Sequence, residues 1–314
     1  MAGLKRRIAG AVFAAASLAA TAADVSALTL VDDAGRTVRM AAPPRRVVTL
    51  APSLTELVFA AGAGATLVGT DRFSDWPASA RALPRVGDAS RVDVERVLAL
   101  RPDLVIVWRH GNTMRELEQL EGAGVRLFFL EPQRLAEVPA AIERLGVLLG
   151  HEAEARSRAA ELRRSLEALR RAHEASTPVR VYYQVWSTPL MTINGSHLIS
   201  DVIALCGGRN VFAGLAPLVP VISTESVVAA DPQAMVTADR EVGGGAALRR
   251  DPQHPAFAVW RRYARMGAVQ RGWLFAINGD AISRQGPRIV AGAAAMCEAL
   301  DIVRRETREK ATVR

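Results

Sequence analysis

The chain has 314 residues, of which 50% are hydrophobic and 23% are charged, so it can fill a large core and lacks the composition of a disordered protein. It is longer than the size at which a single core usually keeps growing, which favours two lobes over one. A net charge of +8 invites a nucleic-acid interpretation, but the positive residues are spread out and form no RNP, zinc-finger or basic-zipper pattern. We therefore expect no nucleic-acid partner.

Residues 1–22 have the features of a signal peptide. Basic residues 5–7 precede an apolar run over 8–19, and residues 20–22 have the A-x-A pattern of a cleavage site. The run is shorter than the ~20 apolar residues of a membrane span, and no Cys lies near the cleavage region to carry a lipid. We expect cleavage after Ala22 or Ala27 and a mature protein that is soluble and exported.

The first half of the mature chain alternates between strands and helices. LTLVDDAGRTVRM predicts a hairpin, RRVVTL a strand that ends before Pro52, and SLTELVFAAG a helix. A helix from Asp93 to Leu100, the strand DLVIVW, a helix from Met114 to Ala123 and the strand VRLFFL follow. This order is typical of an α/β layer with a mostly parallel sheet, which we assign to residues 28–150.

A long helical segment follows this first half. Between Leu135 and about Ser176, apolar residues recur at steps of three and four, with Glu and Arg on the other faces. The pattern predicts one long amphipathic helix, with room for a shorter helix before it. We expect residues 151–176 to connect two lobes.

The second half repeats the first. VERVLALRPDLVIV (94–107) and TESVVAADPQAMVT (224–237) share a leading glutamate, apolar spacing and a proline, and LTELVFAAG resembles LISDVIALCG, with Glu56 matched to Asp201. The strands VRVYYQVW and GWLFAI and a helix from Pro287 to about Arg304 complete this half. The fold class is therefore α/β, with two lobes built on mostly parallel sheets, the second over 177–305, joined by a single long backbone helix.

Cys206 and Cys297 are the only cysteines. In an exported protein, an even pair is better explained by a disulfide than by two buried thiols, although both interpretations stay open from the sequence. A bridge closing a loop of roughly 90 residues stabilises the folded state by about 4 kcal/mol.

Patterns typical of enzymes and metal sites are missing from the sequence. There is no G-x-S-x-G, no Walker loop and no H-E-x-x-H, and the five histidines are scattered. An enzyme whose lobes hold a metal cluster would need more cysteine ligands than the two present here. We expect a protein that is not an enzyme and has no resident cofactor or metal.

Four aromatic residues follow predicted strands. Phe73 and Trp76 come after the strand containing VGT, and Trp108 and Trp186 end the strands DLVIVW and VRVYYQVW. The carboxyl ends of strands are where open α/β sheets bind ligands. Core packing explains any one ring, but the coincidence predicts a shared cleft that stacks on a large planar ligand.

Two charged residues occupy the segment NGDAISRQGPRIV, which we expect to be a loop between the last strand and the last helix. Asp280 can accept and Arg284 can donate hydrogen bonds to a ligand there. The alternative is a solvated loop with Arg288 in the first turn of the helix.

Glu95 and Glu225 each lie two residues after a candidate N-cap, Asp93 and Ser223. A carboxylate at this point is stabilised by the helix dipole by about 0.3 to 1 kcal/mol, which is a sufficient structural reason for each residue alone. Equivalent acids on two lobes also fit a partner with matching positive charges on two related subunits.

Several longer stretches carry a family resemblance over about residues 28–300. They are RRVVTLAPSLTELVFAAG, FSDWP, VERVLALRPDLVIVWRHGN, HLISDVIALCGGRNVF, STESV and GPRIVAGAAAMCEAL. With them, the chain resembles the periplasmic substrate-binding proteins of ABC importers, in the helical-backbone class that includes cobalamin, siderophore and haem carriers. The likeness is strongest to the cobalamin carriers, and it implies cobalamin or a related corrinoid as ligand, with a ferric siderophore or haem as the alternative.

The resemblance also implies roles for individual residues. The family's disulfide matches Cys206 and Cys297, and its permease-docking glutamates match Glu95 and Glu225, which implies a permease dimer as partner. Phe73, Trp108 and Asp280 match cobalamin contacts. We expect a monomer that performs no covalent chemistry.

The sequence departs from the cobalamin carriers at three positions. Ala89 and Val219 stand where tryptophans precede the two glutamate motifs, and Ala281 replaces an aromatic residue after the aspartate. Trp76 and Trp186 are candidates to compensate for these losses.

Overall fold

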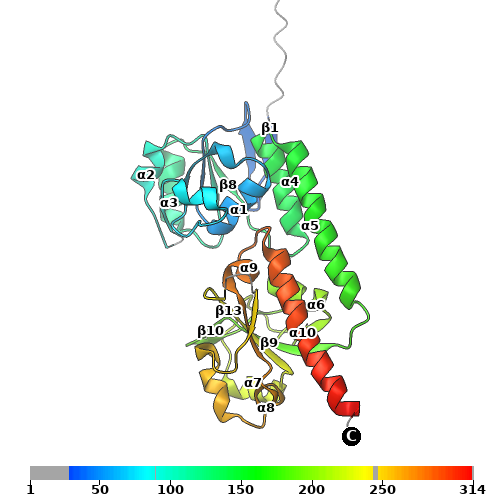
Figure 1. Cartoon of the computed structure of the whole chain (residues 1–314). Helices are drawn as coiled ribbons and strands as arrows, with labels where there is room; N and C mark the ends of the chain where they lie inside the picture. Colours follow the sequence, from blue (N-terminus) through cyan, green and yellow to red (C-terminus); the bar gives the residue numbers. More distant parts are fainter. Residues whose placement is uncertain (1–27, 89, 243–246, 313–314) are drawn as a thin grey trace, which may run out of the picture.

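The computed structural model describes residues 28–88, 90–242 and 247–312. Within these ranges the chain forms two α/β lobes, one above the other in Figure 1, with helices running along one side of both. The expected fold class is confirmed. The segment assigned to the signal peptide lies outside the described residues.

The N-terminal lobe is built on a four-stranded parallel sheet. The strand order is β4-β3-β7-β8, and every residue of β3, β7 and β8 is buried, as expected of a sheet that is covered on both faces. Its strands are β3 (Val47–Thr49), β4 (Leu67–Thr70), β7 (Leu104–Val107) and β8 (Leu127–Phe129), and its helices are α1 (Pro52–Ala60), α2 (Val94–Ala99) and α3 (Met114–Gly122). The hairpins β1 (Leu28–Val31) with β2 (Thr37–Met40) and β5 (Gly87–Asp88) with β6 (Arg91–Val92), and the 3-10 turns η1 (Gly64–Thr66) and η2 (Ala78–Ala82), complete it.

The C-terminal lobe has a five-stranded sheet in the order β12-β9-β13-β15-β14, parallel except for the edge strand β14. Its strands are β9 (Val179–Gln184), β12 (Gly208–Asn210), β13 (Ala234–Asp239), β14 (Leu248–Arg250) and β15 (Leu274–Asn278), with the short pair β10 (Trp186–Ser187) and β11 (Leu190–Met191). Its helices are α6 (Leu198–Leu205), α7 (Thr224–Ala230), α8 (Gly267–Arg271), α9 (Gly279–Ser283) and the 3-10 helix η3 (Pro255–Arg262).

The two sheets confirm the internal repeat. Without β14, the order β12-β9-β13-β15 corresponds to β4-β3-β7-β8, and the repeated segments become α2 with β7 and α7 with β13. Among the described residues, the two non-glycine positions with a left-handed φ are also equivalent, since Arg101 (φ 46°) and Asp231 (φ 36°) each precede the repeated proline. The two halves therefore share even the backbone turn that ends the repeated helix.

The expected helical segment forms a long helix preceded by a shorter one, as the sequence analysis allowed. α4 (Glu137–Leu149) ends at Gly150, which has a left-handed φ of 76°, and α5 (Glu152–His173) continues from the first lobe to the second (Figure 1). The helices pack closely because Gly146 faces Ala155, where an added Cβ would lie 2.2 Å from the Ala155 Cβ. α5 is therefore the long helix that joins the lobes.

The last helix, α10 (Ile289–Thr312), extends beyond Arg304, where the sequence analysis ended it. Arg304 is 7% exposed and donates hydrogen bonds to the carbonyl oxygens of Thr177, Cys206 and Gly207, so it ties the helix to the lobe instead of ending it. The disulfide between Cys206 and Cys297 is confirmed and joins the end of α6 to α10.

The largest apolar core crosses from one lobe to the other. It contains Leu57 of α1, Leu145 of α4, Leu162 of α5, Ile203 of α6 and Leu300 of α10. The lobes are therefore packed together along their helical side. Within the described ranges, no helix is both long and apolar enough to cross a membrane.

Candidate functional site

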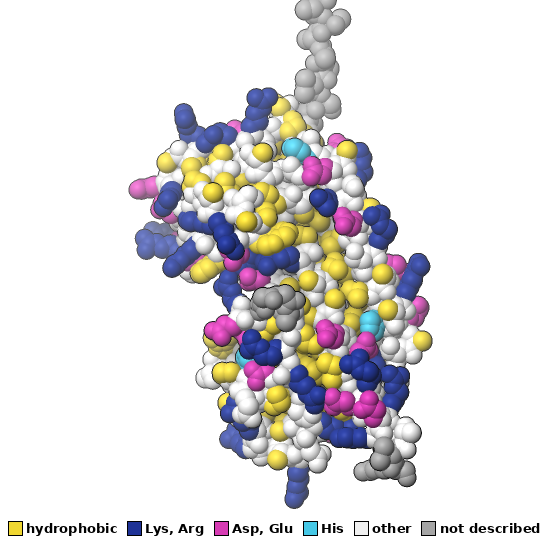
Figure 2. All heavy atoms as spheres, in the orientation of Figure 1, with side chains coloured by type: hydrophobic (Ala, Val, Ile, Leu, Met, Phe, Trp, Pro, Cys, Tyr) yellow, Lys and Arg dark blue, Asp and Glu magenta, His cyan; other side chains and the backbone are white. Residues whose placement is uncertain are grey.

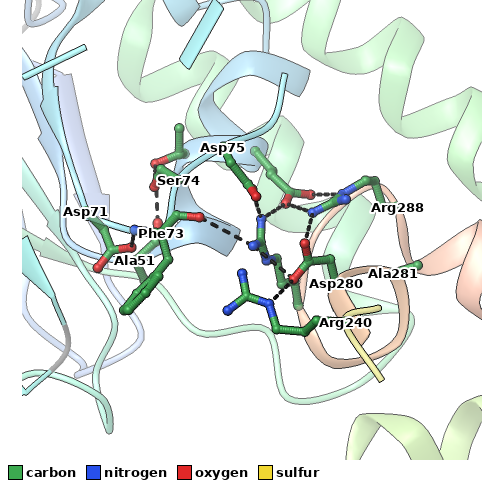
Figure 3. Close-up of polar contacts among 12 residues, drawn as sticks. Ala51, Asp71, Phe73, Ser74, Asp75, Arg240, Asp280, Ala281 and Arg288 are labelled. Atoms are coloured by element: carbon green, nitrogen blue, oxygen red, sulfur yellow. Dashed lines mark hydrogen bonds and ion pairs between the residues drawn. The ribbon is translucent and has the colours of Figure 1, made fainter. Parts of the chain in front are cut away.

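The carboxyl ends of strands from both sheets meet between the lobes. Phe73 follows β4 in the upper lobe, whereas Arg240 follows β13 and Asp280 follows β15 in the lower lobe. Figure 3 shows Phe73 and Asp75 entering from one side and Arg240, Asp280 and Arg288 from the other. Figure 2 shows that the surface is hollowed between the lobes at the left flank, with basic side chains along the lower edge of the upper lobe. The predicted meeting of strand ends is therefore present.

Arg284 bridges the two lobes. Its side chain is 9% exposed, and its Nη1 lies 2.9 Å from Glu56 Oε1 and 2.9 Å from Asp75 Oδ1, both in the upper lobe. Its Nη2 lies 2.9 Å from Asp280 Oδ1 and donates to the Phe73 carbonyl oxygen at 3.3 Å. Arg284 is thus a buried cross-lobe ion-pairing residue, and its donors are already used within the protein.

Arg288 makes a second cross-lobe contact with the same carboxylate. Its Nη2 lies 2.6 Å from Glu56 Oε1, and its Nε donates to Glu56 Oε2 at 3.0 Å. Glu56 is fully buried in α1, so two guanidinium groups supply the partners that a buried carboxylate needs. These three residues form an ionic contact that holds the lobes together beside the site.

The pKa values in this region follow from burial and from these pairs. Burial acts to lower the pKa of Arg284, but hydrogen bonds to Asp75 and Glu56 outweigh it and raise that pKa. Burial acts to raise the pKa of Asp75, but Arg284 brings it below its ordinary value. Burial raises the pKa of Asp71 to about 6, against the opposing effect of the hydrogen bond from the Phe73 N–H. Asp71 therefore anchors the turn that presents Phe73, and its carboxyl group is protonated more readily than that of an exposed aspartate.

A second cross-lobe contact involves the acid that matches Glu56 in the repeat. Asp201, in the first turn of α6, forms a salt bridge with Arg134 of the N-terminal lobe and accepts a hydrogen bond from the Leu135 N–H at 3.0 Å. The repeated acids Glu56 and Asp201 therefore each contact the opposite lobe, one in each direction.

The predicted site residues are only partly brought together. The structure joins Phe73, Asp280 and Arg284, as described above. Trp76 is 39% exposed, but it lines a separate hollow of about 450 Å³ between α1, α4, α5 and α10, where the Arg288 guanidinium lies 5.4 Å from its ring centre. Trp76 therefore lies on the helical side of the ion pairs and Phe73 on their other side.

The remaining two tryptophans, Trp108 and Trp186, differ in how much of the ring is exposed and in whether it is hydrogen-bonded. Trp108 is half-buried at the end of β7, and its Nε1 donates to Glu131 Oε1 at 3.1 Å. Trp186 is 62% exposed on β10, a strand at the left flank of the lower lobe in Figure 1. Trp186 therefore has ring surface to offer a ligand, while Trp108 is partly committed to the fold.

The segment expected to be a loop contains a short helix. Asp280 lies in α9, whose N-cap Asn278 accepts a hydrogen bond from the Ala281 N–H at 2.9 Å, and Arg284 follows the helix. The sequence pattern missed α9 because five residues are too few to show helical periodicity. The helix turns the carboxylate of Asp280 toward Arg284 and Arg240.

The glutamates expected to dock a permease lie at equivalent helix starts. Glu95 and Glu225 are each the second residue of their helix, α2 and α7, and both are exposed. The N-caps Asp93 and Ser223 accept hydrogen bonds from backbone N–H groups three residues on, as predicted. The pKa of Glu225 is lowered by hydrogen bonding at the start of its helix. Both carboxylates are therefore accessible to a partner.

Several site residues escaped the sequence analysis. The sequence analysis did not identify Asp75 or Arg240, placed Arg288 only in the first turn of a helix, and named Glu56 only as part of the repeat. Arg240 directly follows β13, so the rule that singled out the aromatic residues at strand ends could have found it. Within the described ranges, no group of three or more His, Cys, Asp or Glu side chains is arranged to hold a metal ion.

The structure has two lobes built on mostly parallel sheets, with a surface hollow between them and helices packed along one side. This arrangement is that of a two-lobed binding protein with a helical backbone. Residues 47–281 match the model of the periplasmic binding protein family, and the chain belongs to that family. It is therefore a substrate-binding component of the kind that serves ABC importers.

Individual relatives agree with this assignment. The vitamin B12-binding protein of Photorhabdus laumondii is 33% identical over 263 residues, covering 83% of this chain and 89% of the relative. The solved structure of the periplasmic vitamin B12 binding protein BtuF of Vibrio cholerae is 32% identical, with a TM-score of 0.72 over 83% of this chain and 98% of that one. A periplasmic heme binding protein from Pseudomonas aeruginosa is 31% identical, with a TM-score of 0.65 over 82% and 92%.

Proposed function

We propose that this chain captures cobalamin, or a related corrinoid, between its lobes and delivers it to an ABC permease. The proposal rests on site residues that come from both lobes, in a chain that is similar to vitamin B12-binding proteins. Phe73 and Asp280 come from opposite lobes and both contact Arg284, and relatives of about one-third identity over most of the chain are vitamin B12-binding proteins.

The binding mode follows from the exposed side chains. Phe73 is 45% exposed and Trp186 is 62% exposed, so both rings can stack on a planar macrocycle. The Asp280 carboxylate is 21% exposed and can accept hydrogen bonds from amide groups at the ligand's rim. Trp108 and Trp76 would contribute less to binding. Trp108 is hydrogen-bonded to Glu131, and Trp76 lies on the helical side of the ion pairs.

This chain lacks aromatic residues at positions where the cobalamin carriers have them, so a second ligand is also a candidate. Val219 and Ala281 offer no ring, and Ala89 lies outside the described residues. Haem is the second candidate, since a structural relative of 31% identity binds haem and arginines lie beside Phe73. A ferric siderophore is the third.

Calorimetric titration of the purified chain tests the ligand. We expect heat with cyanocobalamin at tens of micromolar protein and little heat with ferric hydroxamates. Phe73→Ala should weaken binding about 10-fold through lost ring contact, whereas Val31→Ala, an exposed apolar truncation on β1, should not. Heat with haemin and none with cyanocobalamin would move the assignment to haem.

Delivery would depend on Glu95 and Glu225. The two acids are exposed, and Glu95 lines a hollow of about 860 Å³ together with several arginines of the same lobe. The double variant Glu95→Arg, Glu225→Arg should bind ligand normally and fail to support uptake. A matched control reverses the exposed acids Glu118 and Glu298, one in each lobe, and should transport normally. Normal uptake by the first variant would remove the docking role.

The remaining expectations belong to the same proposal. Residues 1–22 would direct export and be removed, leaving a monomer with lobes over 28–150 and 177–305 connected by residues 151–176. The protein would catalyse no reaction and hold no resident cofactor, with the corrinoid as cargo. Mass spectrometry of the exported protein would locate the new N-terminus, and size-exclusion chromatography with light scattering would test the monomer.

A further inference from the structure

Two arginines from opposite lobes flank the exposed ring of Phe73. The Arg72 Cζ lies 5.6 Å from the ring centre and the Arg240 Cζ lies 5.7 Å from it. Arg72 follows β4 and Arg240 follows β13, so both are carried by carboxyl ends of parallel strands. The ring expected to stack on a ligand is therefore bordered by positive charge from each lobe.

These arginines differ from the pair that holds the lobes together. Arg284 and Arg288 form their ion pairs with Glu56 and with other carboxylates of the protein, as shown above. The Arg240 side chain is 59% exposed, and its one ion pair with a described residue is a 3.4 Å contact from Nε to Asp280 Oδ1, an atom that Arg284 already contacts at 2.9 Å. Across the described part of the chain, the Arg240 guanidinium donates no hydrogen bond.

Arg240 is nevertheless held in place at its base. An added Cβ at Gly279, the residue before Asp280, would lie 3.2 Å from Arg240 Cγ and 3.3 Å from its backbone nitrogen. The stem therefore lies against the start of α9, while the planar end of the side chain reaches toward Phe73 (Figure 3). A fixed stem with free terminal donors suits a ligand contact better than a structural ion pair.

Arg72 supplies a weaker second charge. It forms no ion pair within the described residues, although it contributes, after the hydrogen bonds from Ser90, to lowering the pKa of Asp88. Its side chain is exposed on the upper lobe. A ligand that stacks on Phe73 would therefore lie near one guanidinium group from each lobe.

We propose that Arg240, assisted by Arg72, is a specificity-determining residue that binds an anionic oxygen at the rim of a planar macrocycle. A guanidinium group pairs with carboxylate or phosphate oxygens in a planar, often bidentate geometry. This proposal rests on the function proposed above. It narrows the ligand to a macrocycle that carries either the phosphodiester of a nucleotide loop or free peripheral carboxylates.

The test compares ligands that differ in these oxygens. Cyanocobalamin carries the phosphodiester, cobyric acid carries a carboxylate, haemin carries two propionates, and dicyanocobinamide has an amidated ring with neither. Each is titrated into the wild type, Arg240→Gln, Arg240→Lys and Arg72→Gln. Arg39→Gln, which removes an exposed arginine of β2, is the matched control for a lost charge.

We expect Arg240→Gln to weaken binding of the anionic ligand about 10- to 100-fold, as for a lost charge-assisted hydrogen bond. Dicyanocobinamide binding should stay within about 2-fold, because it lacks the anionic oxygen. The Arg240→Lys variant should lose less affinity than Arg240→Gln, because lysine keeps the positive charge but lacks the planar guanidinium group. Added salt should weaken binding of the anionic ligand to the wild type more than binding to Arg240→Gln. A loss confined to cyanocobalamin identifies the phosphodiester, and a loss confined to cobyric acid or haemin identifies a carboxylate.

Other results would overturn the inference. Equal losses for dicyanocobinamide and the anionic ligands would mean that Arg240 only shapes the site, and unchanged affinities would mean that it does not touch the ligand. Either result leaves the proposed function standing. Failure of all four macrocycles to bind the wild type would overturn both. Urea denaturation of Arg240→Gln should match the wild type, because the side chain is exposed.

Discussion

Replacing Glu56 by Gln removes the charge at the centre of the cross-lobe ion pairs with little change in shape. Glu56 is fully buried, and its two oxygens serve Arg284 at 2.9 Å and Arg288 at 2.6 and 3.0 Å. Glutamine keeps one acceptor but turns an NH₂ group toward donors. Both arginines then lose their buried counter-charge.

The expected cost follows from the exposure of these partners. Removing one partner of a buried ion pair costs about 3–5 kcal/mol, because the other charge stays buried and unpaired. Arg284 is 9% exposed and retains Asp75 and Asp280, while Arg288 is 22% exposed and can reach water. We therefore expect the lower end, a loss of about 3 kcal/mol in the free energy of unfolding.

Urea denaturation at pH 7 measures this loss, with Asp201→Asn as the matched comparison. Asp201 is 19% exposed and its partner Arg134 is 46% exposed, so that variant should lose only about 1 kcal/mol. A double-mutant cycle between Glu56→Gln and Arg288→Gln should give a coupling of about 1 kcal/mol or more. A Glu56→Gln variant within about 1 kcal/mol of wild type, or no more destabilised than Asp201→Asn, would refute the reasoning.

Three further changes test other parts of the fold. Burial lowers the pKa of His197 from 6.5 to about 4, so the native state binds this proton more weakly than the unfolded state does. Stability present above pH 6.5 should therefore be lost as the pH falls toward 4, by up to about 1.4 kcal/mol per pH unit, and His197→Asn, which still caps α6, should flatten that slope in thermal melts. Changing Cys206 and Cys297 together to Ser should lower the free energy of unfolding by about 4 kcal/mol, measured against urea, and an unchanged midpoint would contradict the loop-closure account. Gly150→Ala should cost about 1 kcal/mol in the same assay because of its left-handed φ, while Gly122→Ala, with open space in α3, should be neutral or stabilising.

The sequence specified the order of elements because each element has a local pattern. Apolar runs, caps and prolines located the strands and helices, and the repeat disclosed two lobes before any contact was known. The break between α4 and α5 could also be located, since Gly150 stands where the apolar stripe changes phase, and the sequence analysis began the connecting helix at residue 151. The short helix α9 was not, because its capping by Asn278 is the single local signal it has.

The candidate site was only partly predictable for a different reason. Strand ends could be located, but the direction of each side chain depends on which residues of the other lobe it meets. Phe73 and Trp76 are three residues apart, yet the ion pairs of Glu56 with Arg284 and Arg288 lie between their two regions. Contacts between residues more than 200 positions apart leave no periodicity for a sequence pattern to show.

The repeat also explains how one duplication supplies two kinds of acid. Glu95 and Glu225 are exposed in the first turns of α2 and α7, whereas the carboxylates of Glu56 in α1 and Asp201 in α6 contact arginines of the opposite lobe. Each lobe thus offers one acid to the exterior and one to its neighbour. With both inward acids paired and a shared apolar core, we expect little lobe movement on binding. Selectivity then has to come from side chains already present at the strand ends, which is why Arg240 is the residue to test.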